Sequence, residues 1–247
     1  MALYMIGLGL SDEKDISIKG YEIIKRCEKV YLETYTSKGC SKERLELFLG
    51  KKIITADREI IEQKEDVILD ARNYETALLI VGDVFSATTH IDLFLRAKEQ
   101  RIKVEVVHNA SIFTAVGQIG LELYKYGRTV SIPFQNKDIE SPIEFIKMNQ
   151  SIGLHTLVLL DLLPKENKFM GIKEAADYLL SKGLPPNQTA IGCAAIGTER
   201  QCIFVSTLGE IKSPKEYPQC FVLPGRLHFV EEKALEFWRT QTPPEFL

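Results

Sequence analysis

Short apolar runs alternate with amphipathic stretches along the first half of the chain. The runs occupy residues 3–8, 29–33, 52–56, 76–81 and 103–108. Between them, apolar residues recur at roughly helical spacing, as at Ile16, Tyr21, Ile24 and Cys27. Strands that alternate with helices in this way predict a mostly parallel sheet with helices on both faces.

Local signals sharpen three elements of this half. The run at 76–81 is uncharged and is closed by Gly82 and Asp83, which is typical of a strand buried on both faces. Residues 58–72 are charged and periodic, with apolar side chains available for one face at Ile61, Val67, Ile68 and Ala71. The sequence Thr-His-Ile-Asp at 89–92 has the form of a capping box and predicts a helix that runs to about residue 100.

The second half predicts a mixed sheet. Helical patterns cover residues 110–124, 142–150 and 172–180, and a last helix runs through Trp238. Apolar runs typical of strands cover residues 129–134, 156–160, 190–196, 202–207 and 220–223. A short polar turn separates the third run from the fourth, which favours an antiparallel hairpin. We therefore expect an α/β protein of two tightly packed domains, residues 1–112 and 113–247, with the boundary near residues 109–114.

Composition limits the classes of partner and site. Of the 247 residues, 45% are hydrophobic and 26% are charged, as in globular proteins. The 31 Lys and Arg against 34 Asp and Glu give a net charge of −3, too balanced for general binding to nucleic acid or anionic lipid. No apolar run approaches the roughly 20 residues of a membrane span, and the N-terminus lacks the basic segment of a signal peptide. The five scattered cysteines and four histidines show no metal-ligand spacing, so we expect no metal, no disulfide framework and a cytoplasmic location.

Three strand-end loops carry the candidate chemistry, because open parallel sheets bind ligands at the carboxyl ends of their strands. In the first, Gly7 and Gly9 follow the opening run, but Asp12 stands where the dinucleotide fingerprint G-x-G-x-x-G requires glycine. A nicotinamide site is therefore disfavoured. A turn that presents bare backbone to a neutral or cationic ligand is still open.

The second loop spans residues 82–90 and the third spans residues 108–112. Asp83 follows a buried strand, and a carboxylate there suits a sulfonium, an amine or a ribose hydroxyl as well as it suits a turn. His108 is more typical of a hydrogen-bonded structural residue than of a base. Helix caps are an alternative role for the short polar side chains of these loops, namely Ser86, Thr88, Thr89, Asn109 and Ser111.

The sequence identifies no catalytic residue. No Ser-His-Asp order, pair of catalytic carboxylates or phosphate-binding Gly-Lys-Ser loop competes with the three loops. Loops that converge on a cleft, with little acid-base machinery, favour a reaction whose chemistry is carried by a cofactor.

At these loops the chain resembles the diphthine synthases. The segments that carry the likeness are MALYMIGLGLSDEKDI at 1–16, VYLETYTS at 30–37, GDVFSATTH at 82–90 and HNASI at 108–112. Further along they are AVG at 115–117, GLELY at 120–124, TVSIPF at 129–134, HTLVLLD at 155–161 and LPGRLH at 223–228. The segments follow one another over almost the whole chain, so the set is specific where a lone G-x-G is not.

The resemblance implies a two-domain tetrapyrrole-methylase-like fold, usually a homodimer, with S-adenosylmethionine in a cleft between the α/β halves. It implies repeated methylation of the amino group of a 3-amino-3-carboxypropyl-modified histidine on translation elongation factor 2, a step of diphthamide biosynthesis that leaves S-adenosylhomocysteine. It implies no metal, and we expect no direct contact with nucleic acid or membrane. Carried over by motif, the cofactor contacts are Leu10, Asp83, Ser86, Ser111, Ile112, Leu160, Ile196 and Gln219.

Three positions depart from the family pattern. Val84 replaces a proline, which restores freedom of φ and should loosen the second loop. Ala195 stands where an arginine is usual, and Gln219 replaces a histidine, which leaves at best an amide contact. These changes bear on cofactor affinity.

Two other functions stay open at the level of the sequence. One is a methylase of the same fold that acts on a small tetrapyrrole-type molecule. The other is a catalytically silent binding protein, which the three departures suggest. The sequence also leaves open how many methyl groups are transferred, whether the neighbouring carboxylate is esterified, and which group accepts the proton.

Overall fold

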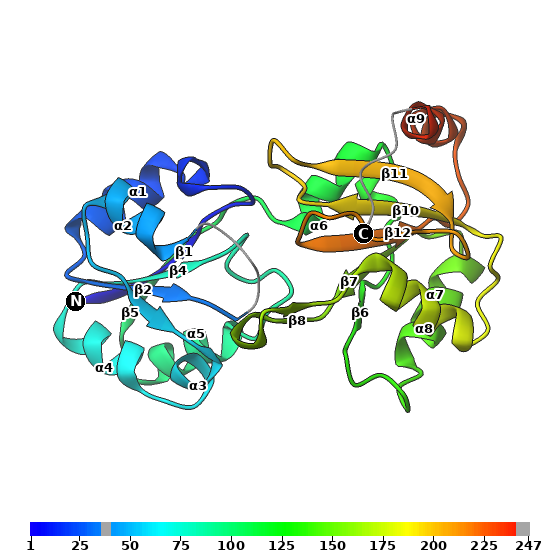
Figure 1. Ribbon diagram of the computed structural model, residues 1–247. Helices are drawn as coiled ribbons and strands as arrows, with labels where there is room; N and C mark the ends of the chain where they lie inside the picture. The colour runs from blue at the N-terminus through cyan, green and yellow to red at the C-terminus, as the bar shows by residue number, and fades with distance from the viewer. Residues whose placement is uncertain (36–40, 241–247) are drawn as a thin grey trace. The chain divides into compact units, whose positions relative to one another are not determined.

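The chain divides into two compact units in the computed structural model, which describes residues 1–35 and 41–240. Unit 1 is Met1–Phe113 and unit 2 is Thr114–Leu247. Each unit is built on its own five-stranded sheet (Figure 1). Within the described residues, no helix has both the length and the apolar character needed to cross a membrane.

The sheet of unit 1 is parallel throughout. Its strands lie in the order β3-β2-β4-β1-β5, and every neighbouring pair runs in the same direction. The strands are β1 (Ala2–Gly7), β2 (Lys29–Glu33), β3 (Ile54–Ala56), β4 (Thr76–Ile80) and β5 (Lys103–Val107). The predicted parallel sheet is therefore confirmed, and β4 is buried along its whole length, as its uncharged run predicts.

Helices cover both faces of this sheet, because successive residues of a strand point to opposite sides. On β1, Leu3 and Met5 belong to one buried cluster, and Tyr4 and Ile6 belong to another. The first cluster is closed by α3 (Arg58–Glu62), α4 (Asp66–Asn73) and α5 (Ile91–Glu99). The second is closed by α1 (Ile18–Arg26) and α2 (Lys42–Leu49). Figure 1 shows these two groups of helices on opposite sides of the strands.

The charged stretch at 58–72 forms two helices, α3 and α4, with a break between Glu62 and Asp66. Ile61 and Val67 are six residues apart, a spacing that a single helix places on different faces. The break lets both side chains enter the core. The predicted apolar face is confirmed, since Ile61, Val67, Ile68 and Ala71 are all buried.

The capping box predicted at residues 89–92 is wrong. The N-cap residue of α5 is His90, and no side chain caps this helix. The Thr89 hydroxyl instead donates to Glu62 Oε1 at 2.7 Å. A hydrogen bond to an ionised carboxylate is stronger than one to a neutral backbone group, which explains why the long-range partner prevails.

The sheet of unit 2 is mixed, as predicted. Its strands lie in the order β11-β10-β12-β7-β6. Only β6 and β7 pair in parallel, while the other neighbours are antiparallel, including the predicted hairpin of β10 and β11. The strands are β6 (Val130–Ile132), β7 (Thr156–Leu160), β10 (Thr189–Ala194), β11 (Cys202–Thr207) and β12 (Gln219–Leu223).

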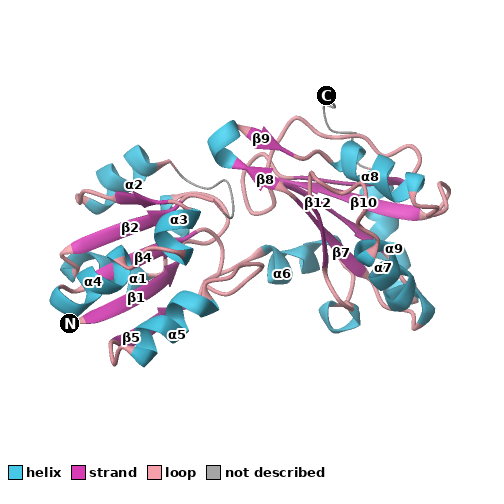
Figure 2. Ribbon diagram, turned by 90° about the horizontal axis from the view of Figure 1, so that it is seen from below, coloured by secondary structure: helices cyan, strands magenta, loops and turns pink. Residues whose placement is uncertain are grey.

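The long helices of unit 2 are α7 (Ser141–Ser151), α8 (Ile172–Ser181) and α9 (Phe229–Arg239). The first two supply side chains to the main buried cluster of this unit. The sequence interpretation missed a small hairpin, β8 (Leu162–Leu163) and β9 (Lys168–Phe169), which Figure 2 shows beyond the main sheet. Strands of two residues are too short to leave a hydrophobic period.

The single helix predicted over residues 110–124 is wrong. This stretch forms the short α6 (Ile112–Ala115) and two 3₁₀ turns, Val116–Ile119 and Leu123–Lys125. Gly120 interrupts the helix with φ +93°, and a Cβ there would lie 2.4 Å from Ala234 Cβ of α9. The chain turns at this glycine because only glycine allows both the conformation and the close approach.

Candidate functional site

The three candidate loops of unit 1 lie together, because β1, β4 and β5 are parallel and all end at one edge of the sheet. The first two loops are joined by main-chain bonds. Gly9 N–H donates to Gly82 O at 3.2 Å, and Gly82 N–H donates to Gly9 O at 2.8 Å. A Cβ on Gly7 would lie 2.6 Å from Gly82 O, so glycine at this position is what lets the loops approach so closely.

Asn109 joins the third loop to the first. Its Nδ2 donates to Gly7 O and to Asp15 O, both at 2.9 Å. Its Oδ1 accepts from Ala110 N–H at 2.8 Å. The sequence makes Asn109 a candidate helix cap, but the main partners of its side chain lie about a hundred positions away in the chain.

Asp83 joins the second loop to the third. Its Oδ2 accepts from Asn109 N–H at 3.0 Å and lies 2.9 Å from His108 Nδ1, while Oδ1 accepts from Phe85 N–H at 3.2 Å. Burial by itself raises the pKa of Asp83, but these hydrogen bonds outweigh burial and hold the pKa below its ordinary value. The edge therefore carries a fixed, ionised carboxylate.

The amide groups of the first glycine turn are occupied by a carboxylate of the protein itself. Asp15 Oδ2 accepts from Leu10 N–H at 3.0 Å and from Ser11 N–H at 2.8 Å. In a dinucleotide fold, such amides bind the pyrophosphate. Asp12, which replaces the third glycine of the dinucleotide fingerprint, instead caps the 3₁₀ turn at Lys14 N–H and lies near Arg44. Asp15 is the residue that closes this turn to anions.

The five implied contacts of unit 1 all lie on these loops. Leu10 is half-buried in the glycine turn, and Ser86 N–H donates to Asp83 O at 3.3 Å. Ser111 is buried and Ile112 half-buried where α6 begins. The structure thus brings Leu10, Asp83, Ser86, Ser111 and Ile112 to one edge of the sheet.

Val84 is anchored more firmly than its freedom of φ suggests. Its side chain is fully buried in a core cluster, and its carbonyl oxygen lies 3.2 Å from His90 Nδ1. Both contacts oppose the loosening that sequence analysis expects from the loss of proline. The loop at 82–90 is therefore held by contacts of its own residues.

The three implied contacts of unit 2 also share one sheet edge. Leu160 ends β7, Ile196 follows β10, and Gln219 begins β12. Because β12 runs antiparallel to both β7 and β10, its first residue meets their carboxyl ends. All three residues are buried.

The Gln219 amide is already used within unit 2. Its Oε1 accepts from Ile172 N–H at 2.9 Å, and its Nε2 donates to Pro214 O at 2.6 Å and Glu216 O at 2.9 Å. A cofactor contact at this position therefore comes from the main chain or displaces one of these bonds. Ala195, which stands where the family usually has an arginine, has φ +47° and is buried.

A second buried polar cluster in unit 2 is fully satisfied. His155 and Glu231 have no exposed surface, and Nε2 of the histidine lies 2.9 Å from Glu231 Oε1. Gly225 N–H donates to His155 Nδ1 at 3.0 Å, which makes Nε2 the protonated nitrogen. Lys125 and the N–H groups of Glu122 and His228 hold the pKa of Glu231 at about 2 despite burial. This cluster ties α9 to β7 and has a structural role.

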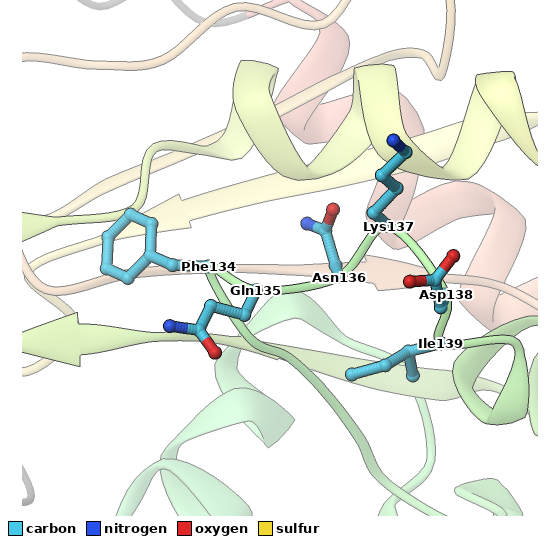
Figure 3. Close-up of a pocket in the computed structure, with 6 residues that line it drawn as sticks. All are labelled: Phe134, Gln135, Asn136, Lys137, Asp138 and Ile139. Atoms are coloured by element: carbon cyan, nitrogen blue, oxygen red, sulfur yellow. The ribbon is translucent and has the colours of Figure 1, made fainter.

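A pocket of about 450 Å³ lies on the turn after β6 and is lined by residues 134–139. Its side chains diverge and do not converge on one point, as Figure 3 shows for Phe134 and Lys137. None of the implied contacts lines this pocket. Among the described residues, no group of three or more His, Cys, Asp or Glu is placed to hold a metal ion.

Comparisons with known proteins identify relatives over nearly the full chain. The family model of tetrapyrrole (corrin/porphyrin) methylases matches residues 2–212. A diphthine methyl ester synthase of Bos taurus is 45% identical and covers 96% of this chain and 94% of its own. One from Schizosaccharomyces pombe is 42% identical, with 96% and 93% covered. A crystal structure of diphthine synthase superposes with a TM-score of 0.90 at 34% identity, covering 97% of this chain and 96% of its own.

Proposed function

The chain belongs to the tetrapyrrole methylase family, and we propose that it uses S-adenosylmethionine to methylate a 3-amino-3-carboxypropyl-modified histidine of translation elongation factor 2. Its similarity to diphthine methyl ester synthases makes it a methyltransferase of diphthamide biosynthesis. The amino group is the first acceptor and is methylated repeatedly. The names of the relatives refer to a methyl ester, so the proposal extends to the neighbouring carboxylate.

The carboxyl edge of unit 1 carries this proposal. Its amide groups at Leu10 and Ser11 are filled by Asp15, which disfavours a phosphate-bearing ligand. Its charged group is the ionised, mostly buried Asp83 carboxylate, which lies among main-chain polar groups. S-adenosylmethionine fits such an edge because it carries a cationic sulfonium, an amino group and ribose hydroxyls but no phosphate.

We assign the cofactor contacts to Leu10, Asp83, Ser86, Ser111, Ile112, Leu160, Ile196 and Gln219. When bound, S-adenosylmethionine supplies a methyl group that is already activated by its sulfonium. The protein therefore contributes mainly by holding the acceptor atom in line and by keeping water away. The bonds that join the three loops of unit 1 serve this role, since a loop fixed at both ends loses little freedom on binding.

Calorimetry with S-adenosylmethionine tests the cofactor assignment. We expect saturable binding by the wild-type chain and a clear loss of affinity in Asp83→Ala. Asp92→Ala is the matched control, because this carboxylate lies on the exposed side of α5 beside Arg96. A folded wild-type chain that gives no binding heat, together with no transfer of label from the cofactor to the modified factor, rules out the proposal.

We further propose that the protein is a cytoplasmic homodimer and that it recognises the surface of the protein factor. The cysteines at 27, 193, 202 and 220 are unpaired, which suits a reducing compartment, while Cys40 lies outside the described residues. Exposed apolar side chains of unit 2, such as Ile152, Phe229 and Val230, support a self-association surface. Light scattering at micromolar concentration distinguishes a dimer from a monomer.

A further inference from the structure

Repeated methylation of an amine raises a chemical requirement that the loops described so far do not meet. An aliphatic ammonium has no lone pair, so its nitrogen accepts a methyl group only after it has lost a proton. Asp83 is a poor acceptor for that proton, because both its oxygens are engaged and its pKa is held low. The inference below rests on the proposed function and identifies the acceptor.

A buried polar cluster lies at the same end of the sheet, one strand over from β4 and its loop at 82–90. β2 is the neighbour of β4, and its carboxyl end carries Glu33 and Tyr35. His90 lies at the end of the loop that carries Asp83. Its Nε2 is 3.5 Å from the Tyr35 hydroxyl, and the two rings meet edge to face. Glu33, Tyr35 and His90 are all buried.

The hydrogen bonds of His90 fix its tautomer. Nδ1 lies 3.2 Å from the Val84 carbonyl oxygen, which can only accept, and 2.9 Å from Thr88 Oγ1. The Val84 carbonyl therefore favours a proton on Nδ1, which places the lone pair on Nε2, facing Tyr35. A separation of 3.5 Å is long for a bond from a hydroxyl, so this pair is held loosely, as is common before substrate arrives.

The surroundings keep this ring neutral. Burial lowers the pKa of His90, so the imidazole is neutral and ready to accept, while Glu33 from β2 and Glu62 from α3 oppose that effect. Burial raises the pKa of Tyr35 to about 12, so the hydroxyl keeps its own proton at neutral pH. Arg58 of α3 is a cation nearby: its guanidinium carbon lies 5.2 Å from the centre of the Tyr35 ring, and its Nε lies 3.7 Å from Glu62 Oε1.

We propose that Tyr35 and His90 form a proton relay that deprotonates the acceptor amine. The ammonium gives one proton to the Tyr35 oxygen while the Tyr35 hydroxyl proton moves to His90 Nε2. The products are a neutral amine with a free lone pair, an unchanged tyrosine and an imidazolium. The imidazolium returns its proton to bulk water before the next round, because each N-methylation yields a new ammonium and one proton overall.

Esterification of the neighbouring carboxylate provides an internal control. A carboxylate already has the electron pair that accepts the methyl group, so forming the ester releases no proton. The relay is therefore required for methylation at nitrogen and not for methylation at oxygen. Loss of cofactor binding or of folding would abolish both reactions.

The experiment compares wild type with His90→Gln and Tyr35→Phe on two forms of elongation factor 2. One form carries the unmethylated side chain, and the other carries the trimethylated amine with a free carboxylate. The matched control is Tyr74→Phe, because Tyr74 is exposed and precedes β4 at the opposite edge of the sheet. Calorimetry of cofactor binding and the histidine-ring NMR titration of the unloaded protein serve as readouts that do not depend on turnover.

At neutral pH, both relay variants should lose N-methylation by about 10²- to 10⁴-fold, the range of a general base. Ester formation and cofactor affinity should match wild type. The residual N-methylation should rise with pH from about pH 7 and level off above the pKa of the acceptor amine, which is an α-amino group, because the fraction of unprotonated amine rises in the same way. The NMR titration should give His90 a pKa below the ordinary histidine value in wild type.

Two results overturn the relay and leave the function in place. One is N-methylation at the wild-type rate and pH dependence in both variants. The other is equal loss of N-methylation and ester formation in Tyr35→Phe, which would make the residue structural. If wild type modifies neither form of the factor, the proposed function itself fails, and the relay fails with it.

Discussion

Two histidines are fully buried in the described part of the chain, one in each unit, and they are held in opposite ways. His155 of unit 2 has both ring nitrogens in close bonds, to Gly225 N–H at 3.0 Å and to Glu231 at 2.9 Å. His90 of unit 1 has its close contacts at Nδ1, to Thr88 Oγ1 at 2.9 Å and the Val84 carbonyl at 3.2 Å, while its Nε2 has only the longer contact of 3.5 Å with the Tyr35 hydroxyl. Burial alone therefore does not indicate function. The loosely held Nε2 of His90, beside a hydroxyl, is what supports the proposed relay.

Breaking the His155–Glu231 cluster should have the largest effect on stability. Glu231→Ala leaves His155 without its partner and leaves Lys125 partly buried beside it. We expect a loss of about 3–5 kcal/mol in the free energy of unfolding, the cost of removing one member of a buried ion pair. Urea denaturation measures this loss. Glu232→Ala, at the exposed neighbouring position, should change stability little, and equal effects of the two variants would contradict the assignment.

Neutralising Asp83 should affect the cofactor edge more than the fold. Asp83→Asn keeps an oxygen that can accept from Asn109 N–H but removes the negative charge that faces the ligand. We expect S-adenosylmethionine affinity to fall by about tenfold, or about 1.4 kcal/mol. Calorimetry gives the affinity, with Asp92→Asn as the matched control. Unchanged affinity would remove Asp83 from the cofactor contacts.

Acid should weaken unit 2 through the same cluster. The pKa of Glu231 is about 2 in the folded protein against an ordinary 4.5, so its contribution is complete above pH 4.5 and is lost between pH 4.5 and 2. The slope approaches about 1.4 kcal/mol per pH unit for one proton. Burial also lowers the pKa of His155, so its protonation acts in the same direction below pH 6.5. In Glu231→Gln, the free energy of unfolding measured by denaturation should change less between pH 4.5 and 2 than in wild type. The same pH dependence in both proteins would contradict this account.

Replacing the loosely held histidine should cost the least stability. His90→Gln removes one hydrogen bond to the Val84 carbonyl, a loss of about 1 kcal/mol. The comparison predicts a small change in urea midpoint together with a large change in N-methylation. A stability loss as large as that of Glu231→Ala would mean that both histidines have structural roles.

The sequence was a good guide to elements whose cause is local. The uncharged run at β4 and the hairpin of β10 and β11 are set by residues adjacent in the chain, and both were predicted correctly. The prediction of a helix over residues 110–124 was wrong because Gly120 packs against α9, which is distant in sequence. The capping box failed for a similar reason, since Thr89 found its partner on α3.

The position of the site could be predicted from the sequence, but the hydrogen bonds within it could not. Three loops meet at one end of the sheet because the strands before them are parallel. Parallel strands were predicted from the sequence, so the position of the loops was predicted too. The roles of Asp15 and Asn109 depend on contacts with no sequence period, such as the bond between Gly7 and Asn109, 102 positions apart. The signal available for Asp15 in the sequence is a carboxylate soon after a Gly-x-Gly turn, and Asp12 carries the same signal. The sequence placed His90 in the predicted capping box and in the second loop but did not connect it with Tyr35, because the proposed role depends on a residue that follows the neighbouring strand.

The most direct test of the account is the intact mass of the modified-histidine peptide of elongation factor 2 after incubation with the chain and S-adenosylmethionine. We predict mass increments of whole methyl groups on that side chain, first at nitrogen and then at the carboxylate. In His90→Gln at neutral pH, the increments at nitrogen should disappear while the ester still forms on a trimethylated peptide. A peptide whose mass stays unchanged in the presence of folded, cofactor-binding wild-type protein would contradict the account.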